Sequence, residues 1–320
     1  VITQSIVPGF VRFEAEAKAM ETQVATFCAA PDEAGLGLVQ ARWRALTLAW
    51  NGVVFYRFGP LDDDLIFPAI IFIESMRQRG TDYTETVREE LSAALAATAS
   101  LDDAFFEALT FNKVGLLALE VLIFEESSAA HAQTPAAVVA EYVAQPRKCE
   151  YLKGVAKLLT TRATQVRAGW DTTYADTGKP YAELFAGQTL PDGNEPVPTL
   201  INGVVQHLEY LKKRKLDVTP DAKLSGTFFE NNLEMVKQLE QAMSQDGAAD
   251  DFGLFDLMAE RGSIDALMTV QQDFVAARTD AEAKSLTAMS TSIGTLEQHF
   301  RNVVPGALGI DLGLNFTDGD

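Results

Sequence analysis

Apolar residues recur near the start of the chain at the spacing of an amphipathic helix. They fall at Phe10, Phe13, Ala17, Met20, Val24 and Phe27. Steps of three and four residues place such side chains on one helix face, which can then pack into a bundle. A second run with this period comprises Val39, Trp43, Leu46, Trp50 and Val53. Gly59-Pro60 ends this segment, because neither residue favours a helix interior.

The rest of the chain keeps the helical period and shows no strand alternation longer than a few residues. Helices are expected at 84–98, 101–126, 147–176, 199–215, 227–245 and 263–301, the second interrupted near 110–112 and the last broken around 278–285. Irregular connections are expected at 61–68, 133–146 and 187–198. The chain is therefore predicted to be all-α.

The number of helices and a short internal echo predict two domains. The pattern Leu-Glu-x-Leu occurs at Leu119–Leu122 and again at Leu208–Leu211, each time within an apolar helix. We predict an N-terminal helical bundle over 1–132 and a C-terminal helical bundle over 133–320. Each would be a four-helix bundle, and the two would be related by internal duplication.

The net charge of the chain excludes two classes of binding partner. The 320 residues include 45 acidic and 26 basic side chains, a net charge of -19. Nucleic acid and anionic membrane surfaces require clustered Lys and Arg, so both are excluded as expected partners. Because no apolar stretch approaches the ~20 residues that span a bilayer, we expect a soluble, processed protein that does not cross the membrane.

The rare residues exclude the common metal motifs. Cys28 and Cys149 lie far apart, so they form neither a CxxC redox pair nor a thiolate zinc site. A disulfide between them would suit an oxidising compartment, but two buried thiols are commoner, and we expect the thiols. His131, His207 and His299 show no HExxH spacing.

Glu120 is the most informative single residue. It is the only polar side chain between Val114 and Phe124, so a helix over this segment has no solvated face. A buried carboxylate has to be paired, metal-bound or protonated. Glu120 therefore either forms a core ion pair or contacts a ligand or metal inside the first bundle.

Arg57 is the most obvious partner for Glu120. It stands among Phe55, Tyr56 and Phe58, directly before Gly59-Pro60, and its planar fork suits bidentate contact with a carboxylate. The pair would either cement the core or line a pocket that presents donors to an acidic ligand. Both alternatives stay open.

Other residues near Arg57 extend this candidate site. Asp62, Asp63 and Asp64 could offer oxygen ligands to a hard cation, although consecutive acids more often form a solvated loop. Trp50 fits the core seam and lies near Arg57 in sequence. The candidate ligand-binding residues are Arg57, Glu120, Trp50, Phe58 and Asp63.

Six segments spread along the chain form a recognisable set: Val7–Phe10, Phe27–Pro31, Ala41–Trp43, Arg57–Pro60, Gly203–Leu211 and Gly313–Asp320. Together they resemble the imelysin family of bacterial periplasmic or lipid-anchored proteins, which is classed with an insulin-cleaving peptidase and associated with iron acquisition. Their order and spacing are similar to those of the family over almost the whole chain.

Two departures from the family pattern concern its proposed metal site. The family motif G-x-H-x-x-E here reads Gly115 to Glu120, with Leu117 in place of the His. Val54 occupies the position of a Glu that family members tend to carry before R-F-G. Leu cannot coordinate a metal, and one carboxylate gives at best a weak site.

We therefore expect no catalytic residue, no metal ligand and no resident cofactor, with iron or another divalent metal as the only candidate. The resemblance implies a non-catalytic periplasmic binding protein, in which a pocket around Arg57 and Glu120 takes an iron- or haem-related ligand and outer-membrane uptake components are partners. A metallopeptidase with an atypical metal site is one alternative, and a structural or protein-docking module is another.

Overall fold

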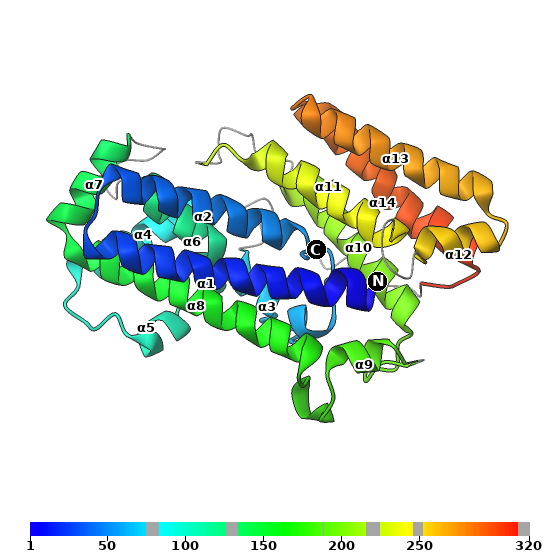
Figure 1. Cartoon of the computed structure of the whole chain (residues 1–320), viewed down its shortest axis with the longest axis horizontal. Coiled ribbons are helices and arrows are strands. Elements are labelled where there is room, and N and C mark those ends of the chain that lie inside the picture. Colours follow the sequence, from blue (N-terminus) through cyan, green and yellow to red (C-terminus); the bar gives the residue numbers. More distant parts are fainter. Residues whose placement is uncertain (75–82, 126–133, 188, 216–224, 246–251, 313–320) are drawn as a thin grey trace.

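The computed structural model of the chain describes residues 1–74, 83–125, 134–187, 189–215, 225–245 and 252–312. Every regular element in those ranges is helical, which confirms the all-α prediction. Figure 1 shows an elongated molecule with two sets of long helices, one toward each end of its long axis.

The long helices of the first set come from two stretches of the sequence, 7–51 and 115–171. They are α1 (Val7–Ala29), α2 (Glu33–Asn51), α6 (Gly115–Phe124) and α8 (Pro146–Asp171). Helix α1 packs against both α2 and α8, and α6 packs against α2 and α8. The six apolar residues that predicted the first helix are each at most 1% exposed, so the predicted face is the one that is buried.

Helices α1 and α8 run antiparallel along each other. At one end the Phe10 ring stacks on Trp170, with ring centroids 5.7 Å apart. Between the ends, the buried Glu14 accepts a hydrogen bond from the Thr164 hydroxyl at 2.9 Å and forms an ion pair with Arg167 at 3.1 Å. Polar contacts thus add to the apolar seam between the two helices.

A disulfide closes the other end of this helix pair. Cys28 at the end of α1 and Cys149 at the start of α8 are bonded, with their Cα atoms 5.6 Å apart. The expectation of two free thiols is therefore wrong. The antiparallel packing brings the end of one helix beside the start of the other, which sequence separation alone does not reveal.

Shorter helices complete the first set. They are η1 (Ile2–Ile6), η2 (Gly59–Leu61), α3 (Ala69–Ile73), α4 (Thr84–Ala96), α5 (Asp103–Glu107), η3 (Phe111–Lys113) and α7 (Pro135–Ala144). Helix α7 lies inside the segment predicted as an irregular connection, and that prediction is wrong. Pro135 occupies the first turn, where its missing N–H is not needed, and the Thr134 hydroxyl caps Ala137 N at 3.3 Å.

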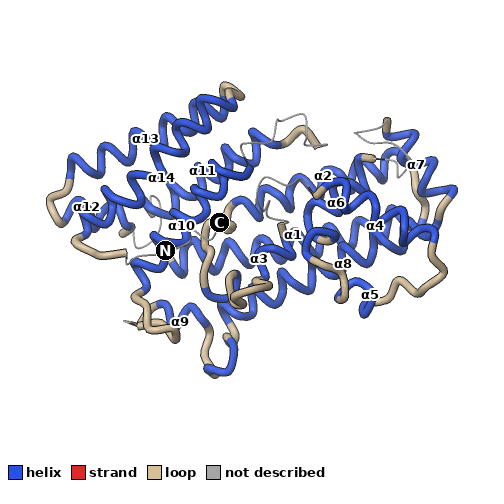
Figure 2. The backbone as a smooth tube through the Cα atoms, turned by 180° about the vertical axis from the view of Figure 1, so that it is seen from behind, coloured by secondary structure: helices blue, strands red, loops and turns tan. Residues whose placement is uncertain are grey.

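The second set contains the helices of the C-terminal half. They are α10 (Pro196–Tyr210), η5 (Leu211–Lys215), α11 (Phe228–Ser244), α12 (Leu254–Glu260), α13 (Ile264–Glu282) and α14 (Leu286–Leu308). The expected break in the last long segment falls between α13 and α14, where Lys284 adopts a φ of 52°. The small elements η4 (Ala175–Thr177) and α9 (Tyr181–Phe185) connect the two sets, and Figure 2 shows them from behind.

Contacts cross the predicted domain boundary. Helix α8 begins after residue 132 and still packs along α1, while α11 of the second set packs against α2. The division into two duplicated four-helix bundles stays a prediction. Within the described part of the chain, no helix has the length and hydrophobicity needed to cross a membrane. Gly313–Asp320, which carried part of the family resemblance, lies outside the described residues.

Candidate functional site

The Arg57–Pro60 segment is held between the two sets of helices. The Phe58 ring stacks on Phe185 of α9 and meets Trp170 of α8 edge-on, with centroids 5.1 and 5.8 Å away. On the other side, a Cβ on Gly203 of α10 would lie 2.9 Å from the Phe58 ring and 3.3 Å from Arg57 N. Only a glycine lets α10 approach this closely, so the segment is fixed against both sets.

The Arg57 guanidinium is only partly engaged. Arg57 is half-buried, and its Nη1 donates to Gln206 O at a long 3.4 Å. The guanidinium carbon lies 6.0 Å from the centroid of the Tyr210 ring. Arg57 Nε is buried and has no hydrogen-bond partner within the described structure. A half-buried guanidinium with donor capacity left can bind an acidic group.

Arg57 faces a polar recess of about 760 Å³, which we call the Arg57 recess. Residues that belong to both sets of helices line this recess. Its lining comprises Arg57, Phe58, Gly59, Asp62, Tyr181, Asp192, Gly193, Asn194, Glu195, Pro198, Thr199, Asn202, Gly203, Gln206, Gly309, Ile310, Asp311 and Leu312. A volume of this size is typical of small-molecule sites.

Charges inside this recess influence each other. Burial lowers the pKa of the Arg57 guanidinium, and the neighbouring Asp62 carboxylate opposes that change. Desolvation raises the pKa of Asp62, and the Arg57 charge opposes that rise in turn. Because the Asp62 side chain is exposed to solvent, screening keeps its effect on stability small. Asp62 thus lies near Arg57 without neutralising it by direct contact.

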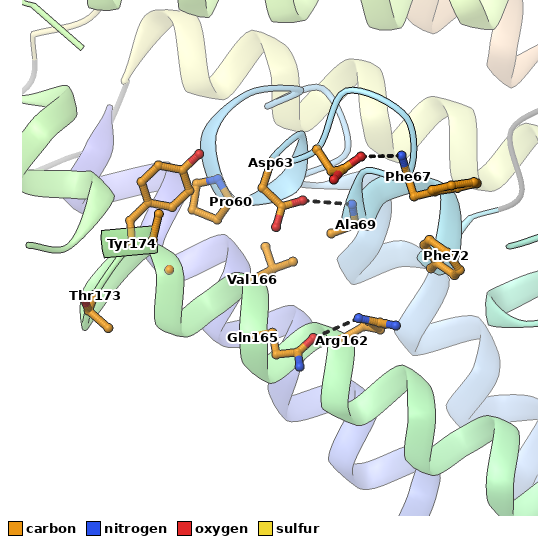
Figure 3. Close-up of a pocket in the computed structure, with 13 residues that line it drawn as sticks. Pro60, Asp63, Phe67, Ala69, Phe72, Arg162, Gln165, Val166, Thr173 and Tyr174 are labelled. Atoms are coloured by element: carbon orange, nitrogen blue, oxygen red, sulfur yellow. Dashed lines mark hydrogen bonds between the residues drawn. The ribbon is translucent and has the colours of Figure 1, made fainter. Parts of the chain in front are cut away.

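Asp63 and Asp64 shape the loop that follows. Asp63 accepts a hydrogen bond from Ala69 N at 3.2 Å, and Asp64 accepts from Ile66 N at 2.8 Å and Phe67 N at 2.7 Å. These two bonds to Asp64 lower the pKa of that exposed carboxyl. Asp63 does not line the Arg57 recess. It lines a second recess together with Pro60, which Figure 3 shows.

Glu120 is buried, at 3% exposure, but it is not paired with Arg57. Its Oε1 accepts a hydrogen bond from Ser225 N at 3.0 Å, in the segment that precedes α11. The Ser225 hydroxyl lies 2.9 Å from the hydroxyl of Thr227, which accepts from Asn231 Nδ2 at 3.1 Å. Across the residues that the structure describes, no hydrogen bond or ion pair joins Glu120 to Arg57. The carboxylate instead links α6 to the start of α11.

The residues at the motif do not fit the metal site that the resemblance implies. Leu117 is half-buried and has no ligand atom, and Val54 is buried as an apolar side chain. One oxygen of Glu120, Oε1, accepts a backbone N–H from Ser225. In the described ranges, no three His, Cys, Asp or Glu side chains gather closely enough to hold a metal ion. The glycine that opens the motif, Gly115, adopts a φ of 76°, a backbone conformation that favours glycine.

Trp50 lies in the core and lines neither recess. It is 1% exposed, packs on Phe13 with centroids 5.1 Å apart, and donates from Nε1 to Glu74 Oε2 at 2.6 Å. Glu74 contributes to the electrostatic field at Arg57. Trp50 thus supports the Arg57 region through Glu74, while Phe58 is the candidate residue that shares the recess with Arg57.

Sequence reasoning missed most of the Arg57 recess. Gln206, Asn202 and Tyr181 lie more than a hundred residues beyond Arg57. Asn202 and Tyr181 belong to no local motif, and Gln206 lies in Gly203–Leu211, which was singled out only for the family resemblance. The turn around Asp192 was predicted only as a loop. One available signal was Gly203, because a glycine in the middle of a helix often marks the close approach of another chain segment.

The protein is thus all-helical in its described ranges and carries a polar recess between two sets of helices. The family model described as Imelysin matches residues 6–307, which is most of the chain. The chain therefore belongs to the imelysin family, as its motifs indicated.

Solved structures show the same fold. An imelysin-like protein from Psychrobacter arcticum 273-4 superposes with a TM-score of 0.72 at 14% identity, covering 98% of this chain and 95% of that one. A putative iron-regulated protein A precursor from Parabacteroides distasonis ATCC 8503 gives 0.68 at 15% identity, covering 96% and 92%. No curated protein matches the chain.

Proposed function

We propose that this imelysin-family protein is a non-catalytic binding protein of the bacterial periplasm, free or lipid-anchored, that takes part in iron acquisition. The observation that carries the proposal is the half-buried Arg57 side chain, which lines a recess of about 760 Å³ and makes only one long hydrogen bond among the described residues, to Gln206 O. The ligand would present an acidic group to the Arg57 guanidinium. Outer-membrane uptake components would be its partners.

The chemistry of the recess favours a hydrophilic ligand. Most of the side chains that line it are polar or charged. They are four carboxylates, from Asp62, Asp192, Glu195 and Asp311, and three amides, from Asn194, Asn202 and Gln206, together with Arg57 and Thr199, beside the apolar or aromatic residues Phe58, Tyr181, Pro198, Ile310 and Leu312. A haem macrocycle needs a broad apolar surface, whereas a small ferric chelate with carboxylates can use Arg57 and the surrounding amides. Of the two iron-related ligand classes, the ferric chelate is therefore the one that we favour.

Two further observations support a periplasmic location and a connection with iron. The Cys28–Cys149 disulfide is of the kind that persists in oxidising compartments such as the periplasm. The Parabacteroides structural neighbour is described as an iron-regulated protein precursor. Leu117 at the position of the family histidine disfavours the metallopeptidase alternative, and the bond from Ser225 N to Glu120 gives that carboxylate a structural role.

Calorimetric titration tests the proposal. Purified protein is titrated with ferric citrate and, separately, with haemin, using the wild type, Arg57→Gln and Arg44→Gln. Arg44 is a matched control, because it is also half-buried and lies 5.4 Å from an aromatic centroid but lines neither recess. We expect ferric citrate to bind the wild type and Arg44→Gln alike, and Arg57→Gln about tenfold more weakly, a loss of about 1.4 kcal/mol.

Equal affinity of the wild type and Arg57→Gln, or no binding of ferric citrate, would contradict the proposed site. A separate assay addresses catalysis. Cleavage of a test protein that a chelator abolishes would support the metallopeptidase alternative instead.

A further inference from the structure

A second recess borders Pro60, the residue next to Gly59 of the Arg57 recess. It has a volume of about 530 Å³ and lies between α8 and the loop that leads into α3. We call it the Arg162 recess; its lining comprises Pro60, Asp63, Asp64, Phe67, Ala69, Phe72, Arg162, Gln165, Val166, Gly169, Thr173, Tyr174 and Ala175. Figure 3 shows Arg162 on the helix side and Asp63 on the loop side.

Among the residues that the structure describes, none serves as a counter-ion to Arg162. Its guanidinium carbon lies 5.1 Å from the centroid of the Phe72 ring, and its Nη1 donates to Gln165 Oε1 at a long 3.3 Å. Its Nε is buried without a partner, and no carboxylate of the described chain lies within ion-pair distance of it. One turn further along α8, Arg167 is paired with Asp171 at 2.7 Å and with Glu14 at 3.1 Å.

The difference between the paired Arg167 and Arg162 is informative because acidic residues outnumber basic ones in the chain, 45 to 26. A half-buried arginine without an acidic partner among the described residues, placed beside an aromatic ring, keeps its fork available for a carboxylate from outside. Arg162 therefore supplies one end of a binding site.

Apolar surface lies next to this charge. The Phe67 side chain is 58% exposed although it lines the recess, and Phe72 and Val166 supply further apolar surface. A ligand with an apolar body would cover the Phe67 ring and remove this surface from water.

Asp63 supplies the opposite charge. Its Oδ1 accepts from Ala69 N at 3.2 Å, and its Oδ2 makes no hydrogen bond within the described structure. The recess thus offers a cation at Arg162, an anion at Asp63 and aromatic surface beside them. A molecule with one carboxylate, one ammonium group and an apolar side chain complements all three.

We propose that the Arg162 recess binds a free amino acid with an aromatic or large aliphatic side chain. The amino acid carboxylate contacts the Arg162 guanidinium, its ammonium group contacts Asp63, and its side chain packs on Phe67 and Phe72. This site is separate from the Arg57 recess, and its existence does not depend on the function proposed there.

Calorimetric titration with L-phenylalanine tests the site, with 3-phenylpropionate as the analogue without ammonium and phenethylamine as the analogue without carboxylate. The proteins are the wild type, Arg162→Gln, Arg162→Lys, Asp63→Asn, the matched control Arg44→Gln, and Arg57→Gln as the control for the other recess. Arg162→Lys keeps the charge but loses the fork, and Asp63→Asn keeps an acceptor for Ala69 N. Circular dichroism confirms that each variant is folded.

We expect L-phenylalanine to bind the wild type and Arg44→Gln equally, and Arg162→Gln at least about tenfold more weakly. Arg162→Lys and Asp63→Asn should fall between these values, 3-phenylpropionate should bind more weakly than L-phenylalanine, and phenethylamine should bind weakest. The proposal is overturned if the wild type does not bind L-phenylalanine at millimolar concentration, or if Arg162→Gln binds it as the wild type does. An equal loss in Arg57→Gln would also overturn it, because the two recesses would then not be separate.

Discussion

Replacing Glu120 distinguishes a carboxylate that holds a backbone N–H from one that neutralises an arginine. In the structure its Oε1 accepts from Ser225 N at 3.0 Å. Glu120→Gln keeps an oxygen acceptor in the same place and loses only the contribution of charge to the hydrogen bond, about 1 kcal/mol. Glu120→Ala leaves the Ser225 N–H unsatisfied at about 1–3 kcal/mol and removes buried methylene surface worth about 0.8 kcal/mol.

Equilibrium unfolding in urea, followed by far-ultraviolet circular dichroism, measures both losses in the free energy of unfolding. We expect Glu120→Gln to cost about 1 kcal/mol and Glu120→Ala about 2–4 kcal/mol. An ion pair with a buried arginine would instead make Glu120→Gln cost about 3–5 kcal/mol, because the arginine would be left without its partner. A loss of that size, equal in the two variants, would refute the assignment.

Three further predictions concern stability. Burial would raise the pKa of the Glu14 carboxyl, but its hydrogen bonds and ion pairs to neighbouring groups lower it. The stabilisation that Glu14 gives the folded state is therefore present above its ordinary pKa of 4.5 and lost as the pH falls. Glu14→Gln should lower the free energy of unfolding by about 1–2 kcal/mol at pH 7. In urea unfolding, the difference between the variant and the wild type should narrow below pH 4.5. Dithiothreitol should lower the free energy of unfolding by about 2–4 kcal/mol and leave a Cys28→Ser, Cys149→Ser double variant unchanged; an equal effect on both proteins would contradict this. Gly115→Ala should cost at least about 2 kcal/mol in the same assay, because the new Cβ would lie 2.4 Å from the Ile73 carbonyl oxygen. A loss below about 1 kcal/mol would show that the backbone there relaxes.

Helix positions were accessible from the sequence because they depend on local periodicity. The run from Phe10 to Phe27 fixes one buried face of α1, and every member of it is buried. Helix α7 was missed because Pro135 and Pro146 suggest a connection, although both open helices in the structure. Proline marks a helix start as readily as a break, and the sequence pattern alone does not separate the two.

The candidate site was only partly accessible, since partners across the fold depend on packing. Glu120 was expected to be buried, and it is, but its partner is a backbone N–H with no sequence signature. Arg57 was singled out by its aromatic neighbours, yet the groups around it come from α10 and from the loop at Asp192. Burial of a polar residue can thus be inferred from its neighbours in the chain, whereas its partner cannot.

We propose that an iron-containing ligand binds in the Arg57 recess and not at the motif around Glu120. A crystal structure of the protein grown with ferric citrate, with anomalous scattering data collected at the iron absorption edge, tests this directly. We expect an iron peak in the recess beside Arg57 with a ligand carboxylate on the guanidinium. An iron peak on Glu120 would contradict the proposal.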